Sequence, residues 1–284
     1  MSDHIFFNSL NILFDGDILK LEKEFDKIKN FKTLWEKQNN KTIDPIKEYE
    51  KLTKYNIRLI LKTDKDYPKL LAQISHPPLG IYIKGDISIL KEKKNIPLAI
   101  VGSRDMTTYG KQVCEKLIKE LAPFKFVIIS GLAYGIDTIS HKQALESNLK
   151  TIAVLGSGLE HIYPEINKPL AKKIIEKGGC LISEYPIYSG PKATHFPQRN
   201  RTISGLSKGV LVIEAQERSG SLITAKLALD QNRDVFAVPN NIFEKTGTGT
   251  NKLIQSGAKL ILNSNDILEE FNLFKKEKTQ KLAN

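Results

Sequence analysis

The sequence predicts an α/β protein with an extended Rossmann-like, doubly wound, mostly parallel sheet and a small helical N-terminal domain. From about residue 96 onward, short runs rich in Val and Ile alternate with segments of helical periodicity. The runs are continuously apolar, which is typical of strands covered on both faces, as in a parallel sheet. Strands that alternate with helices in this way favour βαβ units with right-handed crossovers.

The first 62 residues are helical in pattern, and we expect them to form the small domain. Apolar residues recur at roughly helical spacing between Ile18 and Phe31. The dipeptide Asp44-Pro45 helps to break the region into two pieces, and Ile57–Leu61 is a candidate first strand. We expect a Rossmann-like DNA-binding domain over residues 63–272 and a basic tail over 273–284.

The elements of the larger domain follow in order. The candidate strands are Leu98–Val101, Phe126–Ile129, Thr151–Leu155, Cys180–Ser183, Val210–Ile213, Val235–Val238 and Lys259–Ile261. The helices expected between them are Tyr109–Leu121, Gly135–Ser147, Glu165–Lys177, a helix from about Gln198 to Leu206, and Ser221–Gln231.

Composition narrows the class of protein. Lys plus Arg is 43 against 32 for Asp plus Glu, and the resulting net charge of +11 favours a polyanionic partner. Cys114 and Cys180 form neither a CxxC pair nor a disulfide framework, so we expect buried thiols in a reducing compartment. No apolar stretch is long enough to cross a bilayer, and no secretory signal is visible. The histidines lack metal-ligand spacing. We expect a cytoplasmic protein without a metal or a membrane partner.

The strongest functional signal is the position of the glycines, which follow candidate strands directly. In a parallel sheet such loops share one edge, where doubly wound folds bind ligands. Glycine lets backbone N–H groups approach an anion, and the next helix adds a positive dipole end. We therefore expect several phosphates to be held by Gly102-Ser103-Arg104, by Ser130-Gly131 through Gly135, by Gly156-Ser157-Gly158 and by Ser219-Gly220-Ser221.

Two common nucleotide motifs are missing from these loops. Gly131 and Gly135 give G-x-x-x-G, which is not the G-x-G-x-x-G of dinucleotide-binding proteins. None of the loops ends in the Gly-Lys-Ser/Thr of a Walker A motif. The sequence therefore indicates neither a nicotinamide-dependent enzyme nor a P-loop ATPase, and we expect no cofactor.

A second signal is Phe196 in a basic run with Arg199 and Arg201. Arginine grips phosphate with two parallel hydrogen bonds, and an aromatic ring stacks on unpaired bases for about 1–3 kcal/mol each. Alternatively, the arginines pair with carboxylates such as Glu184 and Glu214, and Phe196 belongs to the core. We expect at least one of the two arginines to contact phosphate.

Asp137 and His141 lie four residues apart on one expected helix, hence on one face. A general acid–base pair is one interpretation. The other, which we prefer, is an acid at a helix start and a hydrogen-bonded histidine, because no nucleophile with a base accompanies them. We expect no catalytic residue.

Ordered motifs over about residues 65–262 resemble the DNA-processing protein A (DprA/Smf) family. They include Tyr67-Pro68, Pro77-Pro78-Leu79, Gly102-Ser103-Arg104, Ser130-Gly131-Leu132-Ala133, Gly135-Ile136-Asp137, Tyr163-Pro164, Ser183-Glu184, Phe196-Pro197, Arg199-Asn200-Arg201, Ser219-Gly220-Ser221, Ala237-Val238-Pro239 and Gly249-Thr250-Asn251.

The resemblance implies a homodimer that binds single-stranded DNA and loads RecA recombinase onto it during natural transformation, without catalysis. It implies a phosphate contact for Arg104 and a backbone cradle at Gly131, Gly135 and Ser219–Ser221. A basic contact at Lys192 and a stacking ring at Phe196 are further expectations. Only a short stretch follows the match, so the winged-helix-like domain of longer members is not expected.

Two alternatives are a nucleotide-processing enzyme of the LOG phosphoribohydrolase type and a nucleotide-sensing module. The LOG enzymes carry a Pro-Gly-Gly-x-Gly-Thr run followed by a catalytic glutamate. Here the corresponding run, Ser219 to Lys226, is followed by no acid, so the carboxylate needed for glycosidic cleavage is missing from that place.

Overall fold

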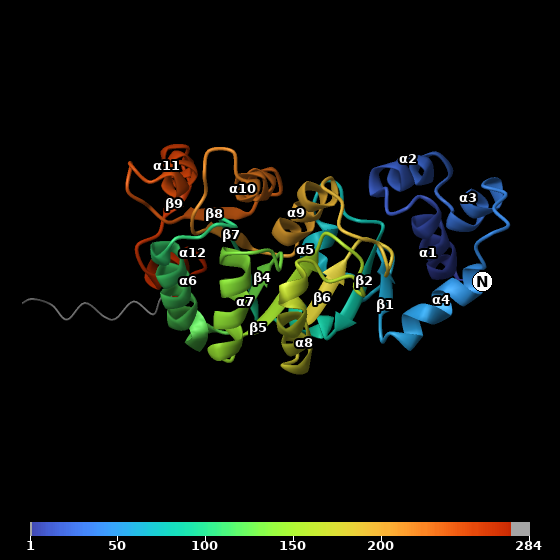
Figure 1. Cartoon of the computed structure of the whole chain (residues 1–284), viewed down its shortest axis with the longest axis horizontal. Helices are drawn as coiled ribbons and strands as arrows, with labels where there is room; N and C mark the ends of the chain where they lie inside the picture. The colour runs from blue at the N-terminus through green and yellow to red at the C-terminus, as the bar shows by residue number, and fades with distance from the viewer. Residues whose placement is uncertain (1, 274–284) are drawn as a thin grey trace, which may run out of the picture.

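A nine-stranded sheet with helices on both faces forms the centre of the molecule (Figure 1). The structure is a computed structural model that describes residues 2–273, so nearly all of the expected basic tail lies outside the described residues. The strand order is β1-β2-β6-β5-β4-β3-β7-β8-β9. The seven strands from β6 to β9 run parallel, whereas β1 and β2 pair antiparallel at one edge. The predicted doubly wound, mostly parallel α/β fold is confirmed.

Each predicted strand is present, with ends shifted by at most a few residues. The bounds are β1 (Arg58–Leu61), β3 (Ile96–Val101), β4 (Phe126–Ser130), β5 (Lys150–Leu155), β6 (Cys180–Ser183), β7 (Gly209–Val212), β8 (Asp234–Ala237) and β9 (Lys259–Leu260). Sequence analysis missed β2 (Gly80–Gly85), which connects the N-terminal strand to the parallel part of the sheet. All residues of β3 and β4 are buried, as their unbroken apolar character predicted.

The two faces of the sheet carry different helices. One face packs against α5 (Lys69–Ala72), α9 (His195–Gly205) and α10 (Gly220–Asp230), and its core includes Ile152, Val154 and Ile203. The other packs against α6 (Thr108–Leu121), α7 (Ile136–Glu146), α8 (Lys168–Glu176) and α12 (Ser264–Glu270). The short helix α11 (Thr248–Gln255) lies near β8. Both cysteines are buried and unpaired.

The N-terminal helices pack on the antiparallel edge of the sheet. They are α1 (Asp3–Leu13), α2 (Ile18–Ile28), α3 (Phe31–Lys37) and α4 (Pro45–Lys54). The expected break at Asp44-Pro45 is the start of α4, where the Asp44 carboxylate accepts from Ile46 N and Lys47 N. Strand β1 belongs to the expected small domain by sequence, yet it pairs with β2 of the sheet. The division into domains at residue 62 stays a prediction.

The strand order creates a topological switch point between β3 and β7. From β3 the chain adds β4, β5 and β6 on one side, and it then returns to place β7 on the other side of β3. The loops that follow β3 and β7 therefore run in opposite directions. A doubly wound sheet binds its ligands in the crevice that such diverging loops leave open. None of the helices within residues 2–273 combines the length and the apolar character that a membrane span needs.

Candidate nucleic-acid interface

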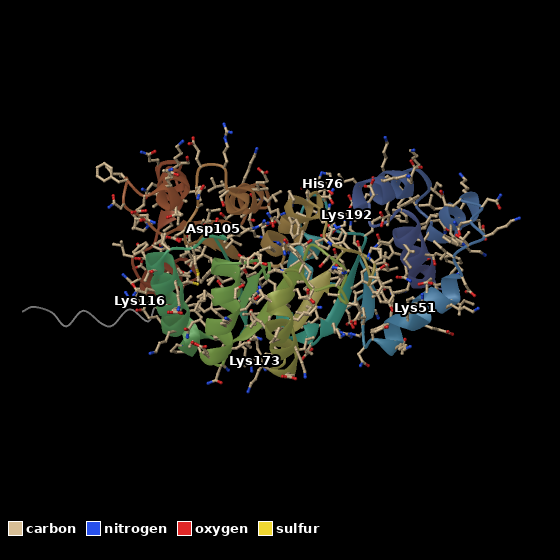
Figure 2. The ribbon with its side chains drawn as sticks, viewed as in Figure 1. Lys51, His76, Asp105, Lys116, Lys173 and Lys192 are labelled. Atoms are coloured by element: carbon tan, nitrogen blue, oxygen red, sulfur yellow. The ribbon has the colours of Figure 1, made fainter. Side chains whose placement is uncertain are left out.

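A cleft of about 520 Å³ lies at this switch point, outside the carboxyl ends of β3 and β7. Figure 2 shows Asp105, which lines it, on the same upper side of the molecule as Lys192, with Lys173 on the lower side. The parallel strands bring loops that are far apart in sequence to one rim. Eight of the predicted site residues line the cleft: Gly102, Ser103, Arg104, Phe196, Arg199, Ser219, Gly220 and Ser221.

The glycines after β3 and β4 serve close backbone packing. Gly135 has a φ of +71°, and a Cβ there would lie 2.2 Å from the carbonyl oxygen of Ser103. The N–H of Ile136 donates to that same oxygen at 3.1 Å. A Cβ on Gly102 would lie 2.6 Å from Ile136 Cγ1. These contacts fix the loop after β3 on the start of α7 and leave the Arg104 side chain exposed at the cleft.

The loop after β4 holds the guanidinium of Arg199. Its Nη1 donates to the carbonyl of Gly131 at 2.7 Å and to the carbonyl of Val154, and a Cβ on Gly131 would lie 2.6 Å from Nη2. The Gly131 N–H donates to Asp137 Oδ2 at 3.1 Å. The Ser130 hydroxyl donates to a backbone carbonyl of β3 at 2.7 Å. The Gly131 N–H and the Ser130 hydroxyl thus donate to acceptors inside the protein, and neither residue lines the cleft.

Burial dominates the electrostatics beneath the cleft. It lowers the pKa of Arg199 from its ordinary value, while Asp137 opposes that shift. It also raises the pKa of Asp137, against the effect of Arg199. His141 Nδ1 shares a 2.7 Å hydrogen bond with Thr151 Oγ1, and burial lowers the pKa of His141 to about 3. Asp137 and His141 therefore both have internal partners, in line with the preferred interpretation of this pair.

Arg104 and Phe196 meet at the mouth of the cleft. The guanidinium carbon of Arg104 lies 5.4 Å from the centroid of the Phe196 ring. Among residues 2–273, Arg104 forms no ion pair with a carboxylate. Phe196 is only partly buried, and it fills the space that Gly156 leaves, where a Cβ would lie 2.9 Å from the ring. The loop after β5 therefore supports Phe196 instead of opening a phosphate site of its own.

The opposite wall is the start of α10. Ser219 is the N-cap, and its hydroxyl accepts from Ser221 N at 3.3 Å and lies 2.6 Å from Ser221 Oγ. A Cβ on Gly220 would meet nothing within 4 Å, so the helix start is open to the cleft. Its first N–H groups and positive dipole end favour an anion.

Sequence reasoning missed Arg218, the second exposed cation of the cleft, which lies in this wall. Arg218 is exposed and lines the cleft directly before the Ser219 cap. Its position beside a Ser-Gly-Ser run was the available signal, because a cation next to a helix start is a common element of phosphate sites. Asp105, Asn200 and Gln216 also line the cleft and were not predicted.

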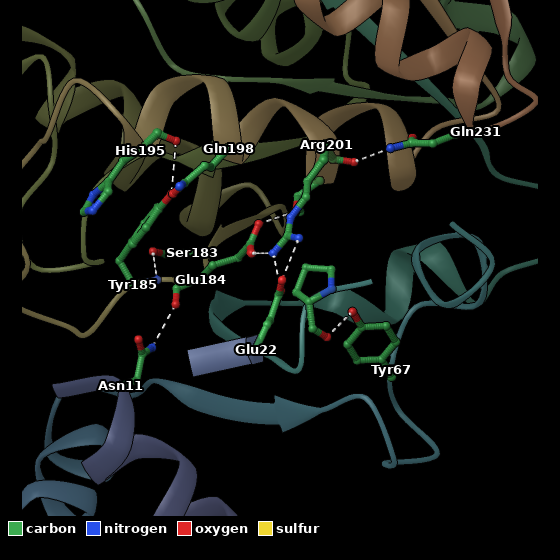
Figure 3. A network of polar contacts seen from close by, with 12 residues as sticks. Asn11, Glu22, Tyr67, Ser183, Glu184, Tyr185, His195, Gln198, Arg201 and Gln231 are labelled. Atoms are coloured by element: carbon green, nitrogen blue, oxygen red, sulfur yellow. Dashed lines mark hydrogen bonds and ion pairs between the residues drawn. The ribbon is translucent and has the colours of Figure 1, made fainter. Parts of the chain in front are cut away.

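Arg201 lies outside the cleft, in a polar network shown in Figure 3. Its Nη2 donates to Glu22 Oε1 and to Glu184 Oε2, both at 2.7 Å. Although burial opposes the shift, these carboxylates raise the pKa of Arg201. Lys192, just before α9, pairs with the single, exposed carboxylate of Asp15 between α1 and α2. Both basic residues thus connect the region of α9 to the N-terminal helices. For Arg201 this is the alternative that the sequence left open, namely pairing with carboxylates.

Helix geometry explains why Arg199 and Arg201 differ. Residues two apart on a helix point in nearly opposite directions, about 200° around the axis. Arg199 points to the sheet and the cleft, so Arg201 faces the N-terminal helices.

The doubly wound sheet and a cationic crevice at its switch point define a Rossmann-like protein with a site suited to phosphate groups. Residues 58–272 match the family described as DNA recombination-mediator protein A. The chain belongs to this family, as its motifs predicted.

Three relatives illustrate the match. DNA processing protein DprA of Bacillus subtilis (strain 168) is 47% identical over 214 residues, which are 75% of this chain and 71% of that protein. The X-ray structure of DprA from Streptococcus pneumoniae superposes with a TM-score of 0.78 at 34% identity, covering 95% of this chain and 98% of that one. DprA from Helicobacter pylori, whose structure is described for its single-stranded DNA binding mode, gives a TM-score of 0.68 at 31% identity and covers 77% and 96%.

Proposed function

We propose that this protein binds single-stranded DNA in the cleft between the loops after β3 and β7. Arg104 and Arg218 contact phosphates, the open start of α10 adds backbone donors, and Phe196 stacks on a base. The observation that carries this proposal is Arg104, exposed and without a carboxylate partner among residues 2–273, on an aromatic ring at the cleft mouth. Cations beside aromatic rings are the common elements of single-strand sites.

The predicted site residues divide into two groups under this proposal. Gly102, Ser103, Arg104, Phe196, Arg199 and the Ser219–Ser221 run border the bound strand. Ser130, Gly131 and Gly135 shape the loops beneath it, while Lys192, just before α9, and Arg201, on α9, pair with carboxylates of the N-terminal region. We also propose that residue 62 divides a small helical domain from the DNA-binding domain.

We further propose the wider role that the family resemblance implies: a cytoplasmic homodimer that loads RecA recombinase onto the bound strand, without catalysis. Glu184 and Glu214, the two carboxylates named above as possible arginine partners, both have structural partners, which supports the last point. Glu214 accepts from the N–H of Thr107 at 3.0 Å, and Glu184 pairs with Arg201.

Fluorescence anisotropy with a labelled oligo-dT tests the binding step. The logarithm of the association constant should fall linearly with the logarithm of salt concentration, and a duplex competitor should displace the oligonucleotide poorly. Phe196→Ala should weaken binding without changing the salt slope, because it removes stacking and no charge. Affinity that does not respond to salt, or equal affinity for duplex, would overturn the proposal.

Two further assays test the rest. RecA filament formation on single-stranded DNA should accelerate when the protein is added, and sedimentation should give the mass of a dimer. Incubation with nucleoside monophosphates should release no base. Release of free base would instead favour the phosphoribohydrolase alternative.

A further inference from the structure

A second aromatic ring lies next to Phe196 but outside the cleft. The rings of Tyr163 and Phe196 have centroids 5.8 Å apart and planes inclined at 52°. Tyr163 is 42% exposed and does not line the cleft, whereas Phe196 does. Phe196 therefore lines the cleft and also contacts Tyr163, so the two rings form one aromatic surface that extends beyond the cleft.

The segment that carries Tyr163 is held by its other residues. Asn167 is buried, and its Nδ2 donates to the carbonyl of Leu132 at 2.9 Å and to Thr138 Oγ1 at 2.8 Å. The Ser157 hydroxyl donates to the carbonyl of His161 at 2.6 Å. These hydrogen bonds hold the segment without the exposed part of the Tyr163 ring, while the ring also packs against Phe196.

The same contacts place another exposed ring nearby. Asn167 bonds to the loop after β4, and Tyr134 in that loop is 48% exposed and follows Ala133, which lines the cleft. The loops after β3, β4 and β5 therefore carry Arg104, Tyr134 and Tyr163 in the order of adjacent strands. Neighbouring strands lie about 4.8 Å apart, so the loops that carry these three side chains follow one another along the rim.

We propose that Tyr163 forms a second base-stacking position for the DNA strand held in the cleft, with Tyr134 on the adjacent loop after β4. The strand leaves the cleft past Phe196 and crosses the carboxyl edges of β4 and β5. This inference rests on the proposed function, because it needs the phosphates of that strand to lie between Arg104 and the start of α10. Stacking on a tyrosine accepts any base, so the position lengthens the site without adding sequence preference.

The test uses oligo-dT in which one residue is 2-aminopurine, whose fluorescence falls when it stacks on an aromatic ring. The reporter is moved along the strand one position at a time. The wild-type protein should quench two neighbouring regions, one at Phe196 and one at Tyr163. Tyr163→Ala should remove the second region, retain the first and weaken binding about 5-fold, at an unchanged salt slope. Tyr163→Phe should restore both regions, because it retains the ring.

Phe243→Ala is the matched control. Phe243 is 87% exposed, follows β8 on the other side of the switch point and does not line the cleft. Its removal should leave the quenching profile and the affinity unchanged. An unaltered profile in Tyr163→Ala, with binding still salt-sensitive, would overturn the second position and leave the cleft proposal standing. Failure of the wild-type protein to bind oligo-dT would instead refute the proposed function itself.

Discussion

The guanidinium of Arg104 stacks on the ring of Phe196, 5.4 Å from its centroid, and joins the loop after β3 to the first turn of α9. A base that stacks on this face of Phe196 must displace the guanidinium. The displaced group is then free to reach the phosphate beside that base. Phosphate contact and stacking are therefore expected to be coupled in energy, and double-mutant cycles measure such coupling.

Arg104→Ala should weaken oligo-dT binding by about tenfold and reduce the salt slope by about one, because one charged phosphate contact is lost. Salt titrations followed by anisotropy check both values. Circular dichroism should not change, since the side chain is exposed. Arg58→Ala is the control, because Arg58 is an exposed arginine on β1 that lies outside the cleft. An unchanged affinity for Arg104→Ala would remove this residue from the site.

Arg218→Ala should likewise weaken binding and reduce the salt slope by about one, since Arg218 forms the opposite wall of the cleft. In the double variant with Arg104→Ala, the slope should fall by about two. Lys173→Ala removes an exposed charge from the opposite side of the molecule and should change neither value. If Arg218→Ala binds like the wild type, the phosphates pass along the Arg104 side alone.

Glu22→Gln should weaken DNA binding by about fivefold, although it removes a negative charge from the protein. Glu22 holds Arg201 on α9, and the same helix carries Phe196 and Arg199 at the cleft. Electrostatics alone predicts the opposite sign, namely tighter binding of a polyanion. Anisotropy measures the affinity, and the fluorescence of Trp35, the single tryptophan, checks that the N-terminal helices remain packed.

The matched control for that variant is Glu24→Gln. Glu24 lies on the same helix, but its carboxylate pairs with Lys27 of that helix. It should leave the affinity unchanged or raise it slightly. Equal affinities for the two variants would show that α9 keeps its position without the ion pair.

Stability should fall in mild acid because of His141. Burial lowers the pKa of this residue to about 3, whereas the unfolded chain has a value near 6.5. The unfolded state therefore binds the proton first, so stability is fully present above about pH 6.5 and is lost as the pH falls toward 3. Between pH 7 and 5 the loss from this group is about 2 kcal/mol. Urea unfolding at both pH values should show a smaller difference in His141→Gln, and an equal difference would exclude His141 as the cause.

The sheet could be predicted from sequence because its strands are buried on both faces. Runs such as Phe126–Ile129 contain no polar residue, because both faces of the strand are buried. Such a run is readily recognised as a strand of a parallel sheet. The missed strand β2 contains an equally apolar core, Ile81-Tyr82-Ile83, between two glycines. This strand precedes the part of the chain in which strands and helices alternate, so the pattern that identified the other strands did not include it.

The site was predicted less completely, because sequence does not tell which hydrogen-bond donors have internal acceptors. Gly131 follows a strand like a phosphate-binding glycine, yet it makes room for Arg199 and gives its N–H to Asp137. Arg201 carries the same charge as Arg104, yet two carboxylates surround it. The spacing of Arg201 from Arg199 does indicate that the two side chains differ in their surroundings, because residues two apart on a helix cannot both face one cleft.

The N-terminal helices share one apolar core with the sheet: the Phe7 ring lies 6.3 Å from that of Tyr82, and Leu10 and Leu181 belong to the same cluster. A recombinant fragment that begins at residue 58, where the family match starts, would leave this surface uncovered. Such a fragment is expected to self-associate through the exposed apolar patch. Its low solubility would then result from the missing helices and not from any property of DNA binding.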